Sequence, residues 1–151
     1  MKTIEELRSA LIKNQDKKIT VIGTTCVGKS TFLRNIPEGI EIGKLAPPLT
    51  EEEKDFYYHA PLTKENNDKM RELVARRAFV KVGKPAFGTA IANGTELIVY
   101  LTIDDKLLKK RVADRKVSFA YAKAMQGFID DEVKESGLPV ITIMVRESIS
   151  S

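Results

Sequence analysis

The sequence predicts an α/β fold with a mainly parallel β-sheet. Apolar, β-branched runs alternate with segments of helical periodicity along the whole chain, which is typical of strands joined by helical crossovers. The first such run, residues 18–23, is almost continuously apolar, as expected of a strand buried on both faces of a sheet. The length of 151 residues and the 42% of hydrophobic residues suit one self-supporting domain over residues 1–151.

The N-terminal third contains the first two expected strands. Thr3 and Glu6 form a T-x-x-E capping pattern, and apolar residues follow at helical spacing. A later helix should end before Pro37, because proline cannot donate a backbone hydrogen bond. The expected elements are a helix over 3–14, a strand over 18–23, a helix over 29–36 and a strand over 39–46.

The remainder of the chain continues the alternation. Thr50 and Glu53 repeat the capping pattern, either Asp104 or Asp105 can cap a helix, and Gly137 stands where a helix end favours a left-handed residue. The expected helices cover 51–59, 64–82, 106–116 and 118–136, and the expected strands cover 84–91, 96–103 and 138–145.

The stretch GTTCVGKS, residues 23–30, lies between the first expected strand and the following helix. It matches the pattern G-x-x-x-x-G-K-[ST] with Gly23, Gly28, Lys29 and Ser30. In this setting backbone N–H groups can surround an anion at a helix N-terminus, and the lysine can neutralise phosphate charge. The Ser30 hydroxyl can bind Mg²⁺. The predicted nucleotide-binding residues are Gly23, Thr24, Thr25, Cys26, Val27, Gly28, Lys29, Ser30 and Thr31. A simple turn would explain a glycine, but not a lysine followed by two hydroxyl residues.

Two other classes of nucleotide-binding protein are disfavoured. A switch GTPase would carry N-K-x-D and D-x-x-G patterns, and neither occurs in the sequence. A motor-type ATPase would need an apolar strand that ends in an acidic residue for Mg²⁺, and PAFGTAI contains no acid.

The segment IVYLTIDDKLLKKRVADRK, residues 98–116, resembles the nucleoside and nucleotide kinase group of P-loop proteins. In that group an apolar strand leads into a helix that ends in an R-x-x-x-R lid, here Arg111 and Arg115. Residues four apart share a helical face, so both guanidinium groups could reach one phosphate chain. The resemblance implies a lid over 104–120, with both arginines catalytic alongside Lys29. A solvated basic helix face is the alternative interpretation.

In element order the resemblance covers residues 18 to 145. It implies a three-layer P-loop fold with a five-stranded sheet in the order 2-3-1-4-5, flanked by helices. It also implies that the insertion over 41–82 binds the acceptor substrate. Kinases of this group commonly have an acidic residue at the end of the second or third strand, and this sequence has no clear counterpart.

Four residues of the insertion are candidates for acceptor binding. Asp55 and His59 are four apart on an expected helix and could orient or deprotonate an acceptor hydroxyl. Arg76 and Arg77 could bind an acceptor phosphate. Alternatively, the first two are a surface acid and a partly buried histidine, and the arginines only complement a helix C-terminus.

The leading hypothesis is an ATP-dependent phosphotransferase that uses ATP and Mg²⁺ and acts on a small acceptor. A nucleotide-binding regulatory or assembly module with little turnover is the second, and a polynucleotide 5′-hydroxyl kinase is a third. A nucleic-acid partner is not expected, because 25 basic and 21 acidic residues are interspersed and the net charge is only +4. A cytoplasmic location is expected, since the sequence has one cysteine, no signal-type apolar core and no long apolar run.

Overall fold

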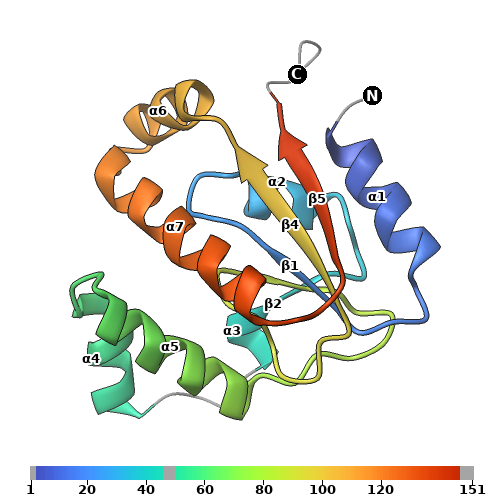
Figure 1. Ribbon diagram of the computed structural model, residues 1–151, viewed down its shortest axis with the longest axis horizontal. Coiled ribbons are helices and arrows are strands. Elements are labelled where there is room, and N and C mark those ends of the chain that lie inside the picture. Colours follow the sequence, from blue (N-terminus) through green and yellow to red (C-terminus); the bar gives the residue numbers. More distant parts are fainter. Residues whose placement is uncertain (1–2, 46–49, 147–151) are drawn as a thin grey trace.

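The computed structural model describes residues 3–45 and 50–146 (Figure 1). Residues 46–49 of the expected insertion lie outside the described residues. The helices are α1 (Thr3–Lys13), α2 (Lys29–Arg34), α3 (Ile42–Leu45), α4 (Glu51–His59), α5 (Lys64–Arg77), α6 (Asp105–Asp114) and α7 (Phe119–Glu135). The strands are β1 (Ile19–Ile22), β2 (Ile40–Glu41), β3 (Ala86–Gly88), β4 (Leu97–Ile103) and β5 (Val140–Val145).

The five strands form one sheet in the order β2-β3-β1-β4-β5, and every pair of neighbours is parallel. This confirms the fold class and the strand order expected from the sequence. Because β1 lies in the middle, the loop that follows it opens at the carboxyl edge of the sheet, between the ends of β3 and β4. In α/β sheets, ligands bind at this edge where the strand order reverses.

Alternating side chains of the central strands separate two apolar layers. Val21 of β1 and Val99 of β4 belong to the larger cluster, which also contains buried residues of α1, α2 and α6. Ile22 and Ile98 belong to a second cluster together with Ile129 of α7. The sheet is therefore covered on both faces, which is the three-layer arrangement of an α/β domain. Figure 1 shows the α4–α5 pair beside α7, on the side of the molecule away from α1.

Three expected elements differ in their bounds. The strand expected over 84–91 is shorter, since β3 covers only Ala86–Gly88. The expected strand over 39–46 contains only two strand residues, and the chain turns into the short helix α3 at Ile42, whose side chain packs in a small cluster with Ala86. The helix expected over 64–82 ends at Arg77. Beyond it Ala78 is extended, and its carbonyl accepts a hydrogen bond from Asn93 N (2.7 Å), while Val80 N donates to Asn93 O (3.1 Å). Tertiary pairing with a later segment thus overrides local helix preference.

Among residues 3–45 and 50–146, no helix is both long and apolar enough to cross a membrane.

Candidate active site

The loop from Gly23 to Gly28 connects the end of β1 to the start of α2. Cys26 and Gly28 have positive φ angles of 66° and 108°, which turn the chain back toward the sheet edge. Gly23 is tightly enclosed, since a Cβ there would lie 2.9 Å from a Val27 methyl and 3.0 Å from the Leu101 carbonyl oxygen. Gly28 is the N-cap of α2, and no side chain caps the helix. The first-turn N–H groups of α2 are therefore available to an anion.

Three side chains of the loop point into the protein. Cys26 and Val27 are buried in the larger apolar cluster, and the buried Thr24 hydroxyl donates to the Ala122 carbonyl of α7 (2.6 Å). These residues can therefore meet a ligand only through their backbone. The side chains of Ser30 and Thr31, in the first turn of α2, are exposed.

Lys29 folds back over the loop, so that its ammonium group donates to the carbonyl oxygens of Gly23 and of Thr24, the latter at 2.8 Å. Burial lowers the pKa of Lys29 to about 7, while the charge of Cys26 acts in the opposite direction. A buried ammonium held only by neutral carbonyls lacks a counter-ion. A negatively charged ligand beside the loop would supply one and raise the pKa of Lys29.

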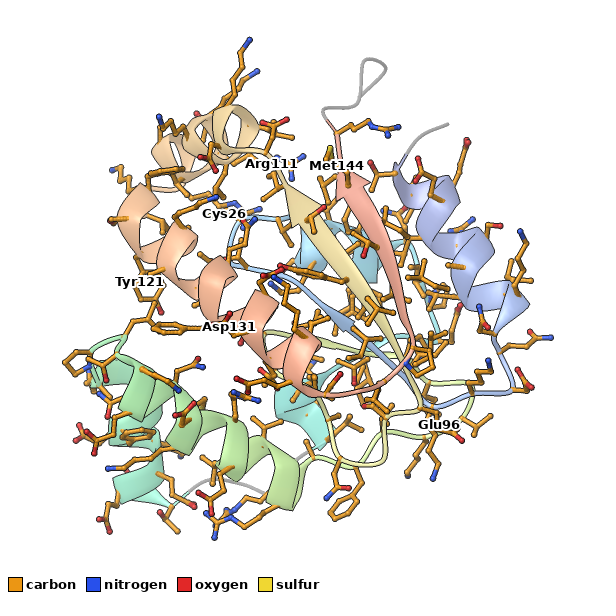
Figure 2. All side chains as sticks on the ribbon, in the orientation of Figure 1. Cys26, Glu96, Arg111, Tyr121, Asp131 and Met144 are labelled. Carbon is orange, nitrogen blue, oxygen red and sulfur yellow. The ribbon has the colours of Figure 1, made fainter. Side chains whose placement is uncertain are left out.

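The two arginines predicted to form a lid occupy different environments. Arg111 Nη1 donates to the Val27 carbonyl of the loop (2.8 Å), and a Cβ on Gly28 would lie 3.3 Å from the same nitrogen. Arg115 is exposed and forms the C-cap of α6. The structure thus brings Arg111, but not Arg115, into contact with the loop. Figure 2 shows Cys26 and Arg111 at the same end of the molecule.

The predicted lid segment is partly fixed. Leu107, Leu108 and Val112 of α6 are buried in the larger apolar cluster, and Asp104 caps the helix by accepting from Leu107 N (2.8 Å). Helix α6 is therefore anchored in the core, and the turn that follows it is held as well, since Val117 packs against the same cluster and its N–H donates to the Val112 carbonyl (2.9 Å).

A cavity of about 320 Å³ lies next to the loop, and we call it the loop cavity. Helices α4 and α5, the segment after β3, and α7 enclose it, and Figure 2 shows Tyr121 between α7 and the α4–α5 pair. Its volume is at the lower end of the ~300–1,000 Å³ typical of small-molecule sites. Its lining residues are Thr25, Lys29, Phe56, Ala60, Pro61, Leu62, Asn66, Asn67, Met70, Arg71, Thr89, Ala90, Tyr121 and Met125.

The four acceptor-site candidates are not among these lining residues. Asp55, His59 and Arg76 are exposed. Arg77 forms an ion pair with Glu53 of α4, so its guanidinium group joins α5 to α4. A role for these four residues in acceptor binding stays a prediction, and the geometry gives it no support.

Sequence reasoning missed the polar residues of α5 that do line the loop cavity, Asn66, Asn67 and Arg71. They lie about one and a half to three turns before the arginines that were selected. The available signal was their spacing: positions 66, 67, 70 and 71 share one face of a helix. The orientation of that face toward the loop, however, depends on the fold.

The residues that could hold Mg²⁺ are few. Among the described residues, no group of three or more His, Cys, Asp or Glu side chains is placed to bind a metal ion. The Ser30 hydroxyl lies directly after Lys29 at the start of α2 and remains the candidate ligand. Thr89 follows the end of β3, where Gly88 pairs with Ile22, and its side chain lines the loop cavity. Strand β3 is thus followed by a hydroxyl residue, where kinases of the group described above commonly have an acidic residue.

No family model matches the chain, and no curated protein matches it. Among solved structures, the chain is similar to a gluconokinase from Sinorhizobium meliloti 1021, with 17% sequence identity and a TM-score of 0.45. The match covers 89% of this chain and 86% of the gluconokinase. A similarity of this degree says nothing about the substrate.

Proposed function

We propose that this protein is an ATP-dependent small-molecule kinase that uses ATP and Mg²⁺. The observation that carries the proposal is that Lys29 belongs both to the G-x-x-x-x-G-K-S loop and to the wall of a cavity large enough for a small acceptor. Phosphoryl transfer needs a donor phosphate and an acceptor hydroxyl held in line at one point. A lysine shared by the phosphate loop and the adjacent cavity marks that point.

The roles of the protein groups follow from their positions. Backbone N–H groups of residues 24–30 would bind the phosphates, and Ser30 would hold Mg²⁺, which supplies neutralisation of phosphate charge. Lys29 would leave the carbonyls of Gly23 and Thr24 for the phosphate chain, because an ammonium group binds an anionic phosphate oxygen more strongly than a neutral carbonyl oxygen. Arg111 lies beside Gly28 and would contact the same phosphates.

The loop cavity indicates the chemical class of the acceptor. Two amides, Asn66 and Asn67, and the Arg71 guanidinium lie in its wall, together with Phe56 and Tyr121. Amides suit hydroxyl groups, and arginine suits a carboxylate or phosphate. We therefore propose a small acceptor that carries hydroxyl groups and one anionic group.

A second candidate function is a nucleotide-binding module with little or no turnover. It is favoured by one observation, that the described lining of the loop cavity includes no Asp or Glu. A kinase commonly uses a carboxylate to accept the proton of the attacking hydroxyl. Without one, transfer would depend on positioning and charge neutralisation alone.

Binding and turnover assays separate the two functions. Thermal-shift and calorimetric titrations with ATP and GTP, each with and without Mg²⁺, should show Mg-ATP binding, and saturation at a hundred times the Kd should add about 2.7 kcal/mol of stability. ADP release is then measured over a panel of nucleosides, nucleotides, sugar acids and other hydroxy acids. Acceptor-dependent ADP release that Lys29→Met abolishes would support the kinase. Binding without acceptor-stimulated release would support the module, and the absence of nucleotide binding would refute both.

A further inference from the structure

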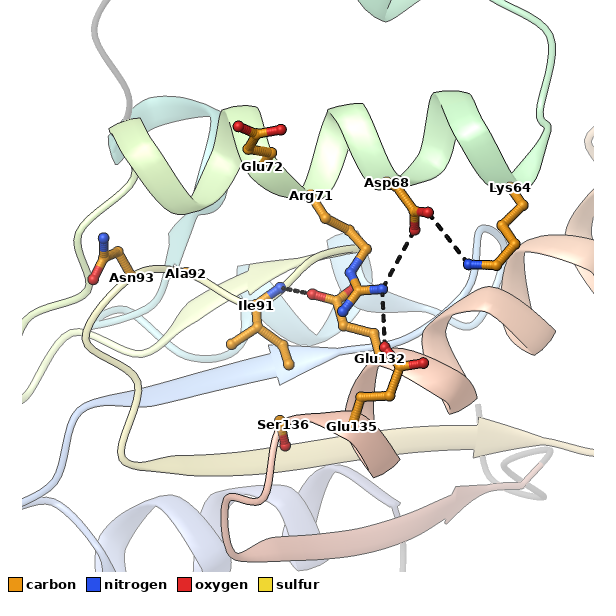
Figure 3. A pocket seen from close by; sticks show the side chains of 10 residues that line it. All are labelled: Lys64, Asp68, Arg71, Glu72, Ile91, Ala92, Asn93, Glu132, Glu135 and Ser136. Carbon is orange, nitrogen blue, oxygen red and sulfur yellow. Dashed lines mark hydrogen bonds and ion pairs between the residues drawn. The ribbon is translucent and has the colours of Figure 1, made fainter.

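Glu132 of α7 is a charged residue in a buried position. It is 5% exposed, yet it lies outside the loop and has no role in the phosphate chemistry proposed above. Its Oε2 accepts a hydrogen bond from the backbone N–H of Ile91 (3.0 Å), and its Oε1 lies 3.4 Å from Nε of Arg71 (Figure 3). Both carboxylate oxygens are therefore occupied, each by a different segment of the chain.

One partner of Glu132, Arg71, lines the loop cavity, and the other, Ile91, is the residue next to a segment that lines it. Arg71 lies in the wall formed by α5. Ile91 directly follows Thr89 and Ala90, which form the wall after β3. The Glu132 carboxylate thus contacts a residue of the first wall and the residue next to the second. Helix α7, which carries Glu132, also contributes Tyr121 and Met125 to the lining of the loop cavity.

Arg71 also borders a second, more open cavity of about 650 Å³, which we call the Glu132 cavity (Figure 3). There Asp68 and Glu135 approach Arg71 Nη1 at 3.6 and 3.5 Å. Their side chains are 49% and 64% exposed, so each attracts the guanidinium only weakly through water. The Arg71 side chain is 27% exposed, so it lies between the buried carboxylate of Glu132 and these two exposed ones.

The position of Arg71 therefore depends on competition among three carboxylates. Glu132 is the buried one, and its attraction is the least screened. If its charge were lost, the guanidinium would lose its buried partner and would be left with the exposed carboxylates of Asp68 and Glu135. The closest contacts use Nε and Nη1, which leaves the Nη2 edge to turn toward a ligand in the loop cavity.

We propose that Glu132 is a positioning residue that holds Arg71 and the Thr89–Ala90 segment in place around the loop cavity, so that Arg71 can bind the anionic group of the acceptor. The proposal rests on the proposed function for the identity of the ligand, but the placement of Arg71 by Glu132 can be tested without it. Burial raises the pKa of Glu132, while Ile91 and Arg71 act in the opposite direction. Keeping such a group charged in the folded state has a cost that an apolar side chain would avoid.

The test compares Glu132→Gln with the matched control Glu135→Gln. Both changes remove one carboxylate from Arg71, but Glu135 is exposed, and the Ile91 N–H donates to Glu132 instead. The two N–H groups face different oxygens of Glu132, and Glu132→Gln replaces one of these oxygens by an NH₂ group, which would face an N–H donor of Ile91 or Arg71. The reporter is the Nε–Hε NMR signal of Arg71, assigned through Arg71→Lys, which removes it. Inorganic phosphate is the probe ligand, added with the loop saturated by the non-hydrolysable Mg-AMP-PNP.

In ligand-free Glu132→Gln we expect the Arg71 Nε–Hε signal to change its chemical shift and its proton to exchange faster with water. In Glu135→Gln we expect the chemical shift and the exchange rate to stay close to those of the wild type. Phosphate should shift the wild-type signal saturably, and its affinity should fall about tenfold in Glu132→Gln, as expected for losing one charge-assisted hydrogen bond. Affinity for Mg-AMP-PNP should stay within twofold in both variants, because Glu132 contacts Ile91 and Arg71, which are not part of the loop.

An unchanged Arg71 signal in Glu132→Gln, or equal changes in both variants, would overturn the positioning role. If phosphate does not change the chemical shift of the wild-type Arg71 signal, the role of Arg71 as an anion ligand is overturned. If Mg-AMP-PNP fails to bind the wild type, the proposed function fails, while the ligand-free NMR comparison still decides the role of Glu132. Should Glu132→Gln not fold, Glu132→Asp replaces it, since the shorter side chain keeps the charge but withdraws the carboxylate from Ile91 N and Arg71 Nε, and the same changes in the Arg71 signal and in phosphate affinity are expected.

Discussion

Replacing Lys29 with methionine removes an ammonium group that the ligand-free protein holds against the carbonyls of Gly23 and Thr24. Burial lowers the pKa of Lys29 from 10.5 to about 7 in the folded state. Between these two values the unfolded chain retains a proton that the folded protein has released. Unfolding therefore takes up a proton, and the free energy of unfolding of the wild type should rise with pH between about 7 and 10.5 and level off below 7.

The size of this effect follows from the same pKa. At ~1.4 kcal/mol per pKa unit, the difference corresponds to at most about 5 kcal/mol, and about 2 kcal/mol of it is regained between pH 7 and pH 9. Water that reaches the half-buried side chain makes this an upper bound. Lys29→Met has no ammonium group, so its free energy of unfolding should lack the increase with pH that is due to Lys29.

Urea unfolding of both proteins at pH 6, 7, 8 and 9 measures the effect, and the exposed Lys17→Met serves as the control. We expect the wild type and Lys17→Met to share one pH dependence and Lys29→Met to be flatter by up to about 2 kcal/mol. Parallel curves for all three proteins would refute the burial of the Lys29 ammonium. Nucleotide binding provides a second readout: Mg-ATP should bind with net proton uptake at pH 8, because the phosphates raise the pKa of Lys29, and Lys29→Met should abolish this uptake.

Three further substitutions test the loop and its surroundings. Arg111→Ala should weaken Mg-ATP binding by about tenfold in calorimetry, because one charged contact beside Gly28 is lost. Arg115→Ala should change this affinity less than twofold, because Arg115 is at the exposed C-cap of α6. A larger loss of affinity in Arg115→Ala than in Arg111→Ala would support the hypothesis that Arg115 belongs to a lid over the phosphates. Gly28→Ala should destabilise the fold by about 1–2 kcal/mol in urea, because φ is 108° there, and an unchanged midpoint would contradict the left-handed N-cap. Gly127→Ala in α7 should raise the free energy of unfolding by about 0.5–1 kcal/mol without altering ligand binding, because nothing lies within 4 Å of an added Cβ. A lower free energy of unfolding in this variant would show that this surface of the helix is covered.

Local patterns predicted most of the fold because they depend on neighbouring residues. The capping boxes and apolar periodicity placed α1, α4 and α6 to within a few residues, and the apolar runs placed β1, β4 and β5. Errors occurred where a distant segment decides the conformation. The 78–80 segment is extended because it pairs with Asn93, and β2 is short because Ile42 packs beside Ala86.

The candidate site divides in the same way. The loop could be predicted, since its motif is contiguous and needs only a strand before it and a helix after it. The loop cavity could not, because its walls come from α4, α5, the segment after β3, and α7, and only the folded chain places Asn66 and Arg71 opposite Lys29. The arginine pair Arg111 and Arg115 shows the limit of helical spacing as evidence: Arg111 Nη1 donates to the Val27 carbonyl, whereas Arg115, one turn later at the C-cap of α6, is exposed.

Helix α7 connects the two halves of the proposed reaction. Near its N-terminus, the Ala122 carbonyl accepts the Thr24 hydroxyl and so fixes the loop that would hold the phosphates. One turn later Met125 lies in the cavity wall, and two further turns along, Glu132 holds the segment after β3 and Arg71. These residues recur at intervals of three and seven, so they lie along one face of a single helix. The relative position of the proposed donor and acceptor sites would therefore be set by a helix rather than by loops, which suits a reaction that depends on positioning.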